Sequence, residues 1–374
     1  MKISILTEVR IYFYNNDYYV DGSFYKIIER YANKFNDISL FSRVISSNND
    51  KISGFKKIEL NNLKIYNIGS IFNFLIKKMN NDYKKIFIES DLIILRIPSL
   101  VFLKVMNIIK KHHKKYMCEI MGCAFDAYWN HGIIGKILAI PMHLFTKKIV
   151  MKANYCLYVT NSYLQSKYPT KAYYINASNV NIDIPKNVKD YSNIDKKNIN
   201  LFTSAALNVK YKGQQYVIKA ISKLKKQNIN INYYLAGKGD SKYLSSIAKK
   251  YGVESNVHFL GMLSKEDLEK AMINSDIYVQ PSLQEGLPRS LIEAMNLGLV
   301  CLGTNTSGIP ELLEDKCVFK RKSTSSFIKC FNYILNDNFD EMSKRNKDES
   351  KKYYSKILDK KRNDFYDYIV KDIK

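Results

Sequence analysis

The chain has 374 residues, of which 46% are hydrophobic and 25% charged, and its formal net charge is +24. This length suits two domains that each bury a core, and this composition excludes disordered and fibrous proteins. The positive charge favours an anionic partner such as a phosphorylated substrate, acidic lipid or nucleic acid, although a general compositional bias toward Lys, Asn, Ile and Tyr explains it equally well.

The six cysteines form no CxxC pair, and no histidine lies at a spacing suited to zinc, so we expect reduced thiols in the core. The first residues carry too short an apolar run for a signal peptide, and no run of about 18 apolar residues is present to span a membrane. We therefore expect a cytosolic protein.

The amino-terminal half alternates short apolar runs with helical periodicity, which is typical of a parallel α/β sheet. An aromatic loop is expected over 11–20, and Ser23 is expected to cap the first helix. Gly22 stands between strand and helix, as in an anion-binding corner or an ordinary turn. The predicted strands are 2–7, 38–44, 91–95, 114–121 and 155–160, and the predicted helices are 24–35, 100–111 and 133–153.

A loop predicted over 122–132 holds the only tryptophan, Trp129, near Asp126 and His131. It follows a predicted strand, and ligands of open α/β sheets bind at the carboxyl ends of their strands. These three residues are therefore candidate ligand-binding groups. The alternative is that Asp126 caps a helix and His131 makes a structural hydrogen bond.

The helix predicted over 133–153 is rich in both apolar residues and lysines. Such a helix can rest on anionic lipid, or its lysines can simply face solvent. The lysines concerned are Lys147, Lys148 and Lys152, with Lys110, Lys111, Lys114 and Lys115 from the preceding region.

A polar, aperiodic region at 176–198 separates the two halves. We expect a hinge there and a last helix that crosses back to the first domain. The predicted boundaries are 1–185 for the amino-terminal domain, 186–198 for the hinge, 199–345 for the carboxyl-terminal domain and 346–374 for the last helix.

The carboxyl-terminal half opens with a predicted strand at 199–203, and Lys212 and Gly213 then stand at the head of a helix. A lysine in this place can neutralise a bound phosphate cluster. Two further predicted strands, 231–236 and 257–260, end at Gly237 and Gly261, which is consistent with backbone contacts to a ligand.

Residues 276–313 read as a strand, a loop, a helix and a second strand. Glu285 lies in the loop and Glu293 on the helix, and the N–H groups of Gly286 and Leu287 between them suit an anion. A pyrophosphate flanked by hydroxyl-binding carboxylates describes a nucleotide-sugar site. The alternative is that both glutamates are solvated.

The sequence EGLPRSLIEAMNLG at 285–298, followed by SGIPELL at 307–313, closely resembles the signature of the family-4 retaining glycosyltransferases. That resemblance implies the GT-B fold, in which two doubly wound Rossmann-like domains face a cleft. Segments 119–122, 125–129 and 157–161 resemble, more loosely, the amino-terminal domain of the bacterial capsule and exopolysaccharide transferases of this family.

The resemblance implies a role for each candidate residue. Glu285 would contact the donor sugar, Glu293 the ribose and Lys212 the phosphates. The family usually has an arginine six residues before that lysine, where Ala206 stands here, so we expect Lys210 or Arg289 to replace it. The implied catalytic set is Glu285, Lys212 and Asp126, the donor-binding set is Glu293, Gly286, Leu287, Arg289, Lys210, Gly237, Gly261 and Gly22, and the acceptor-side set is His131 and Trp129.

The implied reaction moves a hexose from a UDP- or GDP-sugar to a hydroxyl of a glycan or lipid-linked glycan, with retention, in cell-surface polysaccharide synthesis. No Asp-x-Asp motif occurs, so no metal and no cofactor are expected. Specific nucleic-acid binding is not expected, and the enzyme would work in the cytoplasm, including at the inner face of the plasma membrane. Two alternatives stay open: another GT-B enzyme such as a nucleotide-sugar epimerase, and a non-enzymatic basic protein that binds nucleic acid or membrane.

Overall fold

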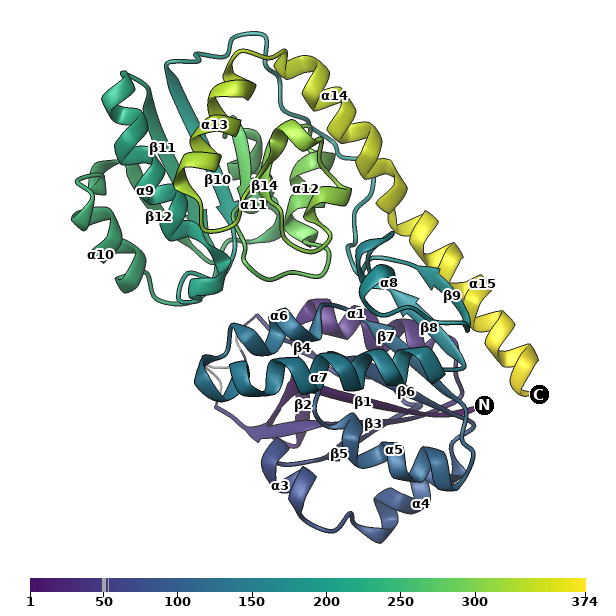
Figure 1. Cartoon of the computed structure of the whole chain (residues 1–374). Helices are drawn as coiled ribbons and strands as arrows, with labels where there is room; N and C mark the ends of the chain where they lie inside the picture. Colours follow the sequence, from purple (N-terminus) through teal and green to yellow (C-terminus); the bar gives the residue numbers. More distant parts are fainter. Residues whose placement is uncertain (49–51, 53) are drawn as a thin grey trace. The chain divides into compact units, whose positions relative to one another are not determined.

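The chain folds as two α/β units, and the computed structural model describes residues 1–48, 52 and 54–374 (Figure 1). The first unit consists of Met1–Val159, Gln165–Ala177 and Lys360–Lys374, and the second of Thr160–Leu164 and Ser178–Asp359. Each unit has its own sheet.

The sheet of the first unit is mainly parallel and is built on β1 (Lys2–Tyr14). The apolar residues of its central strands, such as Ile3, Ile5 and Ile94, are fully buried because both faces of a parallel sheet are covered. The parallel strands beside β1 are β3 (Asp37–Ser46), β5 (Leu63–Asn67), β6 (Leu92–Ile97), β7 (Tyr116–Ile120), β8 (Tyr155–Tyr158) and β9 (Tyr173–Asn176), and the antiparallel ones are β2 (Asp17–Val20) and β4 (Lys56–Lys57).

Helix α1 follows the antiparallel strand β2, and the next helices along the chain, α3 to α7, follow parallel strands (Figure 1). Their bounds are α1 (Gly22–Ala32), α3 (Ile71–Ile76), α4 (Asn81–Glu89), α5 (Phe102–Lys111), α6 (Ala124–Trp129) and α7 (Gly132–Lys152), while α8 (Tyr163–Lys167) and α15 (Ser355–Ile373) have residues in both units. From α15, the side chains of Phe365, Tyr366 and Ile369 are buried in the first unit's core, where Tyr366 packs on Tyr31 and Phe35 with ring centroids 5.6 Å apart in each pair.

The sheet of the second unit is entirely parallel, in the order β12-β11-β10-β13-β14-β15. Its strands are β10 (Asn198–Ser204), β11 (Asn230–Ala236), β12 (Val257–Gly261), β13 (Ile277–Gln280), β14 (Val300–Thr304) and β15 (Val318–Phe319). Its helices are α9 (Gln214–Leu224), α10 (Lys242–Lys250), α11 (Lys265–Ile273), α12 (Arg289–Asn296), α13 (Thr324–Leu335) and α14 (Phe339–Ser350). Because the strands are parallel, all their carboxyl ends lie along one edge of the sheet.

The aromatic loop expected over 11–20 was wrong, because these residues form a β-hairpin. β1 continues to Tyr14 and pairs antiparallel with β2. The turn between them is Asn15 and Asn16, with φ of 47° and 62°, and asparagine tolerates this left-handed conformation in two-residue hairpin turns. The β-branched and aromatic residues on both sides provide the strands.

Three further expectations for the first unit were wrong in detail. Part of the predicted loop 122–132 is helix α6, and β9 adds a strand beyond the predicted last one. The first helix is capped by Asp21 rather than Ser23, since Asp21 Oδ1 accepts a hydrogen bond from Ser23 N at 2.9 Å. An aspartate at the N-cap accepts a hydrogen bond from the backbone N–H two residues later, as a serine at an N-cap also would.

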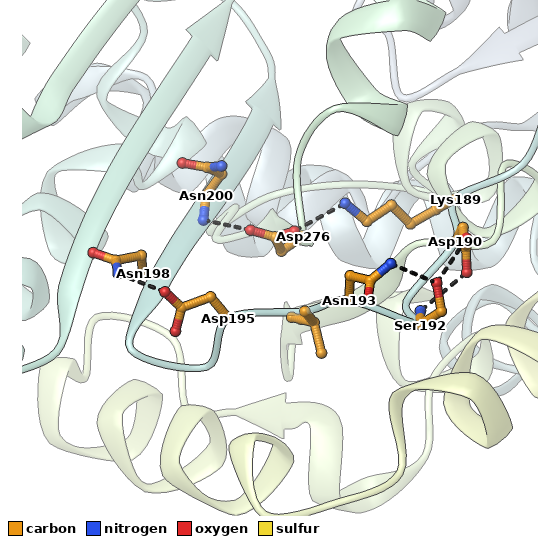
Figure 2. A pocket seen from close by; sticks show the side chains of 9 residues that line it. Lys189, Asp190, Ser192, Asn193, Asp195, Asn198, Asn200 and Asp276 are labelled. Atoms are coloured by element: carbon orange, nitrogen blue, oxygen red, sulfur yellow. Dashed lines mark hydrogen bonds and ion pairs between the residues drawn. The ribbon is translucent and has the colours of Figure 1, made fainter.

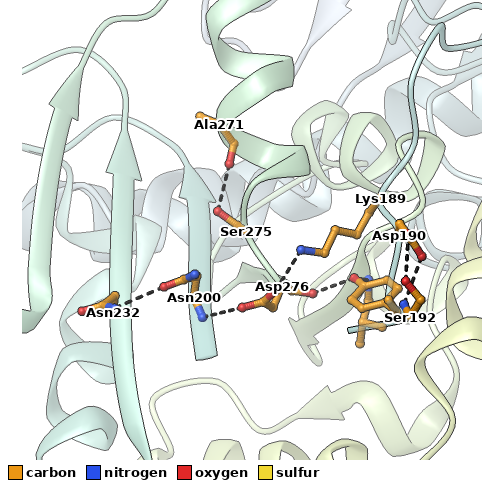
Figure 3. Close-up of polar contacts among 10 residues, drawn as sticks. Lys189, Asp190, Ser192, Asn200, Asn232, Ala271, Ser275 and Asp276 are labelled. Carbon is orange, nitrogen blue, oxygen red and sulfur yellow. Dashed lines mark hydrogen bonds and ion pairs between the residues drawn. The ribbon is translucent and has the colours of Figure 1, made fainter. Parts of the chain in front are cut away.

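The predicted hinge residues 186–198 are fixed to the second unit by a cluster around Asp276 (Figure 3). Lys189 Nζ contacts Asp276 Oδ1 at 2.9 Å, and the other carboxylate oxygen accepts a hydrogen bond from Asn200 N at 2.8 Å. Tyr191 OH donates to the Asp276 carbonyl at 2.6 Å. The chain enters the second unit at Ser178, directly after Ala177 and before the predicted hinge.

The six cysteines are free thiols, and five of them are buried. This confirms the expectation of reduced core cysteines. In the part of the chain that the structure describes, no helix is both long and apolar enough to cross a membrane.

Candidate active site

The centre of the candidate site is an ion pair between Lys212 and Glu285 in the second unit. Lys212 Nζ lies 2.7 Å from Glu285 Oε1, and both side chains are mostly buried. Lys212 ends a short 3-10 turn after β10, and Glu285 lies in the loop after β13. These adjacent parallel strands bring together two residues that are 73 positions apart in the chain.

Gly213 allows this approach. Its φ is +78°, and a Cβ atom there would lie 1.9 Å from the carbonyl oxygen of Pro281. The neighbouring backbone is also joined, because Leu283 N donates to Tyr211 O at 2.7 Å. A side chain at 213 would therefore push the lysine turn away from the Glu285 loop.

Gln280 also donates a hydrogen bond to Glu285, and it was not among the residues predicted from the sequence. Its Nε2 donates to Glu285 Oε1 at 3.2 Å and to Ser282 Oγ at 2.8 Å. Its Oε1 accepts from Tyr278 OH at 2.9 Å and from Ser290 Oγ at 3.2 Å. The available signal was a polar residue at the carboxyl end of an otherwise apolar strand, which is where ligand-binding groups gather.

Glu293 lies on α12, the helix that follows the Glu285 loop. Burial raises the pKa of its carboxyl above the ordinary value of 4.5, while Arg289 and Lys265 act to lower that pKa and Glu269 to raise it. Within the described residues, no hydrogen-bond partner of the Glu293 carboxylate is found. A desolvated carboxylate of this kind gains strongly from a ligand that donates hydrogen bonds.

The amino end of α12 has no capping side chain among the described residues, and Pro288 is its N-cap. The loop before it is held by Gly308 N, which donates to Gly286 O at 3.0 Å, and Leu287 is buried beside it. Arg289 is exposed at the first helical position. This end of a helix attracts anions because its N–H groups lack helical partners.

The remaining candidates of the second unit line the same sheet edge. Gly237 N donates to Gly261 O at 2.7 Å, which joins the ends of β11 and β12, and a Cβ atom at 237 would lie 2.0 Å from Ala205 O. Lys210 Nζ lies over the Tyr243 ring, 4.8 Å from its centroid. Ala206, which stands in place of the family's arginine, accepts a hydrogen bond from Gln214 Nε2 through its carbonyl at 3.1 Å.

Gly22, Asp126, Trp129 and His131 belong to the first unit. Asp126 is buried on α6, and Trp129 stacks on Phe125 with ring centroids 5.2 Å apart. His131 precedes α7 as its N-cap without a capping side-chain bond. Asp126, Trp129 and His131 thus form one short segment, and Gly22 is the first residue of α1.

A buried ion pair in the first unit was not expected from the sequence. Arg96 Nε lies 2.6 Å from Glu119 Oε2, with both side chains almost wholly buried near the carboxyl ends of β6 and β7. Tyr31 OH donates to the same carboxylate at 3.3 Å. Burial, followed by the negative Glu119, raises the pKa of Tyr31 well above its ordinary value.

A polar pocket of about 290 Å³ lies at the opposite end of the second unit's strands (Figure 2). It is lined by Lys189, Asp190, Asn198 and Asp276, which flank the amino ends of β10 and β13. These groups are paired with one another or with backbone, as described for Asp276 above. The polar groups that line this pocket therefore hold residues 186–198 against the second unit's sheet. No group of three or more His, Cys, Asp or Glu side chains in residues 1–48, 52 and 54–374 is placed to hold a metal ion.

Comparison with known proteins assigns the chain to a family. Residues 183–353 match the model of the glycosyl transferases group 1. Protein CapJ of Staphylococcus aureus is 33% identical over 377 residues, which cover 97% of this chain and 90% of CapJ. The amylovoran biosynthesis glycosyltransferase AmsK of Erwinia amylovora is 34% identical over 110 residues, which cover 28% of this chain and 27% of AmsK.

Among solved structures, HepE of Anabaena in complex with UDP has a TM-score of 0.69 at 14% identity and covers 98% of this chain and 100% of HepE. The same protein in complex with UDP-glucose has a TM-score of 0.66 at 15% identity.

The chain is a glycosyltransferase with the GT-B fold. It belongs to the glycosyl transferases group 1, in the branch with the exopolysaccharide enzymes, as the sequence motif at 285–313 predicted.

Proposed function

We propose that this glycosyltransferase moves a hexose from a UDP- or GDP-sugar to a hydroxyl of a glycan or lipid-linked glycan in cell-surface polysaccharide synthesis. The observation that carries the proposal is the Lys212–Glu285 pair beside the uncapped amino end of α12. That combination offers a cation and free N–H groups for a diphosphate, with a carboxylate for hydroxyls next to it.

The donor would bind along the carboxyl edge of the second unit's sheet. Its diphosphate would meet Lys212, Arg289 and the N–H groups of Gly286 and Leu287, and its ribose hydroxyls would donate to Glu293. The raised pKa of Glu293 fits this role, since hydrogen bonds from the ribose replace the water that burial removes. Lys210, Gly237 and Gly261 would contribute to the same donor site, and Gly22 would contribute from the first unit.

The chemistry follows from this placement. The bond between the anomeric carbon and the diphosphate oxygen breaks, and the acceptor oxygen bonds to that carbon on the same face, so that the configuration is retained. The acceptor hydroxyl gives its proton to the leaving diphosphate. Lys212 and the α12 amino end offset the charge that develops on the leaving group, which is the main electrostatic requirement of the step.

The acceptor would bind at the first unit, with Asp126, Trp129 and His131 as its contacts. A polysaccharide product is supported by the name of AmsK, an amylovoran biosynthesis glycosyltransferase, over the 110 residues that it shares with this chain. A uridine nucleotide donor is supported by the binding of UDP and UDP-glucose to HepE, which has the same fold. The proposal uses no divalent metal, so activity is expected to survive EDTA.

A thermal-shift titration with UDP, GDP, ADP and CMP tests the donor site. A nucleotide at 100 times its dissociation constant stabilises the fold by about 2.7 kcal/mol, which raises the melting temperature by several degrees. We expect one diphosphate to give this shift, and Lys212→Ala and Glu293→Gln to lose it. Lys226→Ala, which alters an exposed lysine of the same unit, is the matched control and should keep it.

Two results would contradict the proposal. A shift given weakly by all nucleotides, at low salt only and unchanged in Lys212→Ala, would indicate a non-specific basic binding protein. Conversion of the donor sugar to an isomer without a glycosidic product would indicate an epimerase.

A further inference from the structure

The solvent-facing side of α7 carries a continuous row of exposed apolar side chains. Ile133, Ile137, Ile140 and Leu144 are 80%, 70%, 59% and 59% exposed. They are spaced four, three and four residues apart, which places them in one line along a helix of 3.6 residues per turn. In Figure 1, α7 is the long helix that follows α6. A surface helix normally places polar residues on this side.

The opposite side of α7 is already packed. Ala139, Met142, Ile149 and Val150 are buried, and a Cβ atom at Gly135 would lie 2.2 Å from the Tyr128 carbonyl oxygen. The helix therefore cannot rotate to bury its apolar row in the core. Packing within the first unit therefore does not explain why these apolar side chains are exposed.

The charges around this row have a single sign. Helix α7 contains no aspartate or glutamate, and its lysines are exposed. In helical projection they flank the apolar row on both sides. We call the two sets together the α7 face: Ile133, Ile137, Ile140 and Leu144, with Lys136, Lys147, Lys148 and Lys152.

Trp129 extends this face at the amino end of the helix. Its ring is 41% exposed, and Lys136 Nζ lies 5.7 Å from the ring centroid. Tryptophan favours the boundary between the headgroups and the acyl chains of a bilayer, because its ring is apolar and its N–H is polar.

We propose that the α7 face binds the surface of an anionic phospholipid bilayer, with α7 lying in the plane of the interface. The apolar row would enter the boundary between headgroups and acyl chains, and the flanking lysines would contact lipid phosphates. This inference goes beyond the proposed function and does not depend on it, because it uses no residue of the donor site and shares only Trp129 with the proposed acceptor contacts.

Charge favours this occupant over a second copy of the chain. A two-fold dimer through the α7 face would bring the lysines of both copies together, in a protein whose formal net charge is +24. An anionic bilayer offers apolar acyl chains to the row and phosphates to the lysines. Self-association would cover the row but would leave the lysines without counter-charges.

Vesicle flotation of the full chain tests the proposal, and its single tryptophan reports on the same face. We expect the protein to float with vesicles of equal parts phosphatidylglycerol and phosphatidylcholine, and to remain unbound with phosphatidylcholine alone. On the anionic vesicles, Trp129 emission should move to shorter wavelength, because the indole leaves water.

Paired variants separate the α7 face from general properties of the chain. Ile137→Ser with Leu144→Ser should abolish flotation, while Phe72→Ser with Ile76→Ser should not, although these α3 side chains are 70% and 61% exposed. Lys147→Gln with Lys148→Gln should weaken partition by roughly 30-fold. Lys225→Gln with Lys226→Gln, two exposed lysines of the second unit, should have little effect.

Four results would overturn the proposal. The first is no binding to anionic vesicles, and the second is equal binding to neutral ones. The third is a stable dimer in sedimentation velocity that Ile137→Ser with Leu144→Ser converts to monomer, since the α7 face would then be a contact between copies. The fourth is that both pairs of α7 variants, with folding verified by circular dichroism, still bind anionic vesicles as the wild type does.

Discussion

The orientation of Glu285 depends on two donors that come from different strands. Lys212 follows β10, and Gln280 ends β13, and both donate to the same oxygen, Oε1. The glutamate and the lysine could be predicted from the sequence because the motif and the Lys-Gly pair are local patterns. For Gln280 the only signal was its place at the end of an apolar strand, and its role depends on hydrogen bonds to Tyr278 and Ser290 that only the packed loop brings together.

We predict that Gln280→Met will reduce kcat by about tenfold or more, by loosening Glu285 rather than by removing a group that touches substrate. It also leaves the buried Tyr278 hydroxyl and the half-buried Ser290 hydroxyl without their acceptor, at a cost of about 1–3 kcal/mol in the free energy of unfolding. Steady-state kinetics and urea unfolding measure the two effects. Ser222→Ala, near the carboxyl end of α9, is the control. Unchanged kcat in a folded Gln280→Met enzyme would show that Glu285 needs no second donor.

Replacing Glu293 by glutamine is expected to stabilise the free protein at pH 7 but to weaken nucleotide binding. Because burial raises the pKa of Glu293 above 4.5, its charged form destabilises the folded state, and stability falls as pH rises from about 4.5 through the raised pKa. Glu293→Gln should therefore raise the melting temperature of the free protein at pH 7. That gain should disappear near pH 4, where the wild-type carboxyl is protonated in both states.

The same substitution should weaken nucleotide binding at pH 7, because the amide is a poorer acceptor for ribose hydroxyls than the carboxylate. Melting curves from pH 4 to pH 8, with and without nucleotide, measure both effects. Glu266→Gln, an exposed glutamate of α11, should change neither. A lower melting temperature for Glu293→Gln at pH 7 would mean that its carboxylate is stabilised in the free protein.

At the scale of elements, prediction was most accurate where a strand and a helix follow one another directly. The segment from β13 through α12 to β14 was anticipated to within about two residues, including Gly298, whose φ of +79° ends the helix. The failures were the Asn15–Asn16 hairpin turn and helix α6. In both, a short polar or aromatic stretch suggested a loop, and pairing with β3 or packing on α7 stabilised a regular element instead.

The ends of β6 and β7 are joined by the buried pair of Arg96 and Glu119, which no local pattern indicated. We predict that Glu119→Leu will cost about 3–5 kcal/mol in the free energy of unfolding, because Arg96 would remain buried without its counter-ion. Adding Arg96→Met should recover most of that loss. Urea unfolding of the four proteins in this double-mutant cycle measures it, and a double variant no more stable than Glu119→Leu would contradict this explanation.

At the scale of the whole molecule, the family and fold followed from one motif, but the assignment of segments to units did not. Thr160–Leu164 belongs to the second unit, where the Glu311 carboxylate accepts from the backbone N–H groups of Asn161 and Ser162 at 2.6 and 3.1 Å. In the last helix, Ile357 is exposed whereas the neighbouring Leu358 is buried. Such details depend on tertiary contacts, which periodicity does not specify.

The last helix gives a prediction about how the two units melt. Ile369 is fully buried in the core of the first unit, whereas Ile357, on the same helix, is exposed. Ile369→Ser should therefore cost about 2–5 kcal/mol in the stability of the first unit, and Ile357→Ser almost nothing. Calorimetry of Ile369→Ser should show a new transition at lower temperature, because two units with separate cores need not unfold together. The proposed nucleotide donor should raise only the upper transition, since the donor residues other than Gly22 lie in the second unit. A single transition that moves as a whole would mean instead that the first unit's core and the nucleotide site unfold as one cooperative system.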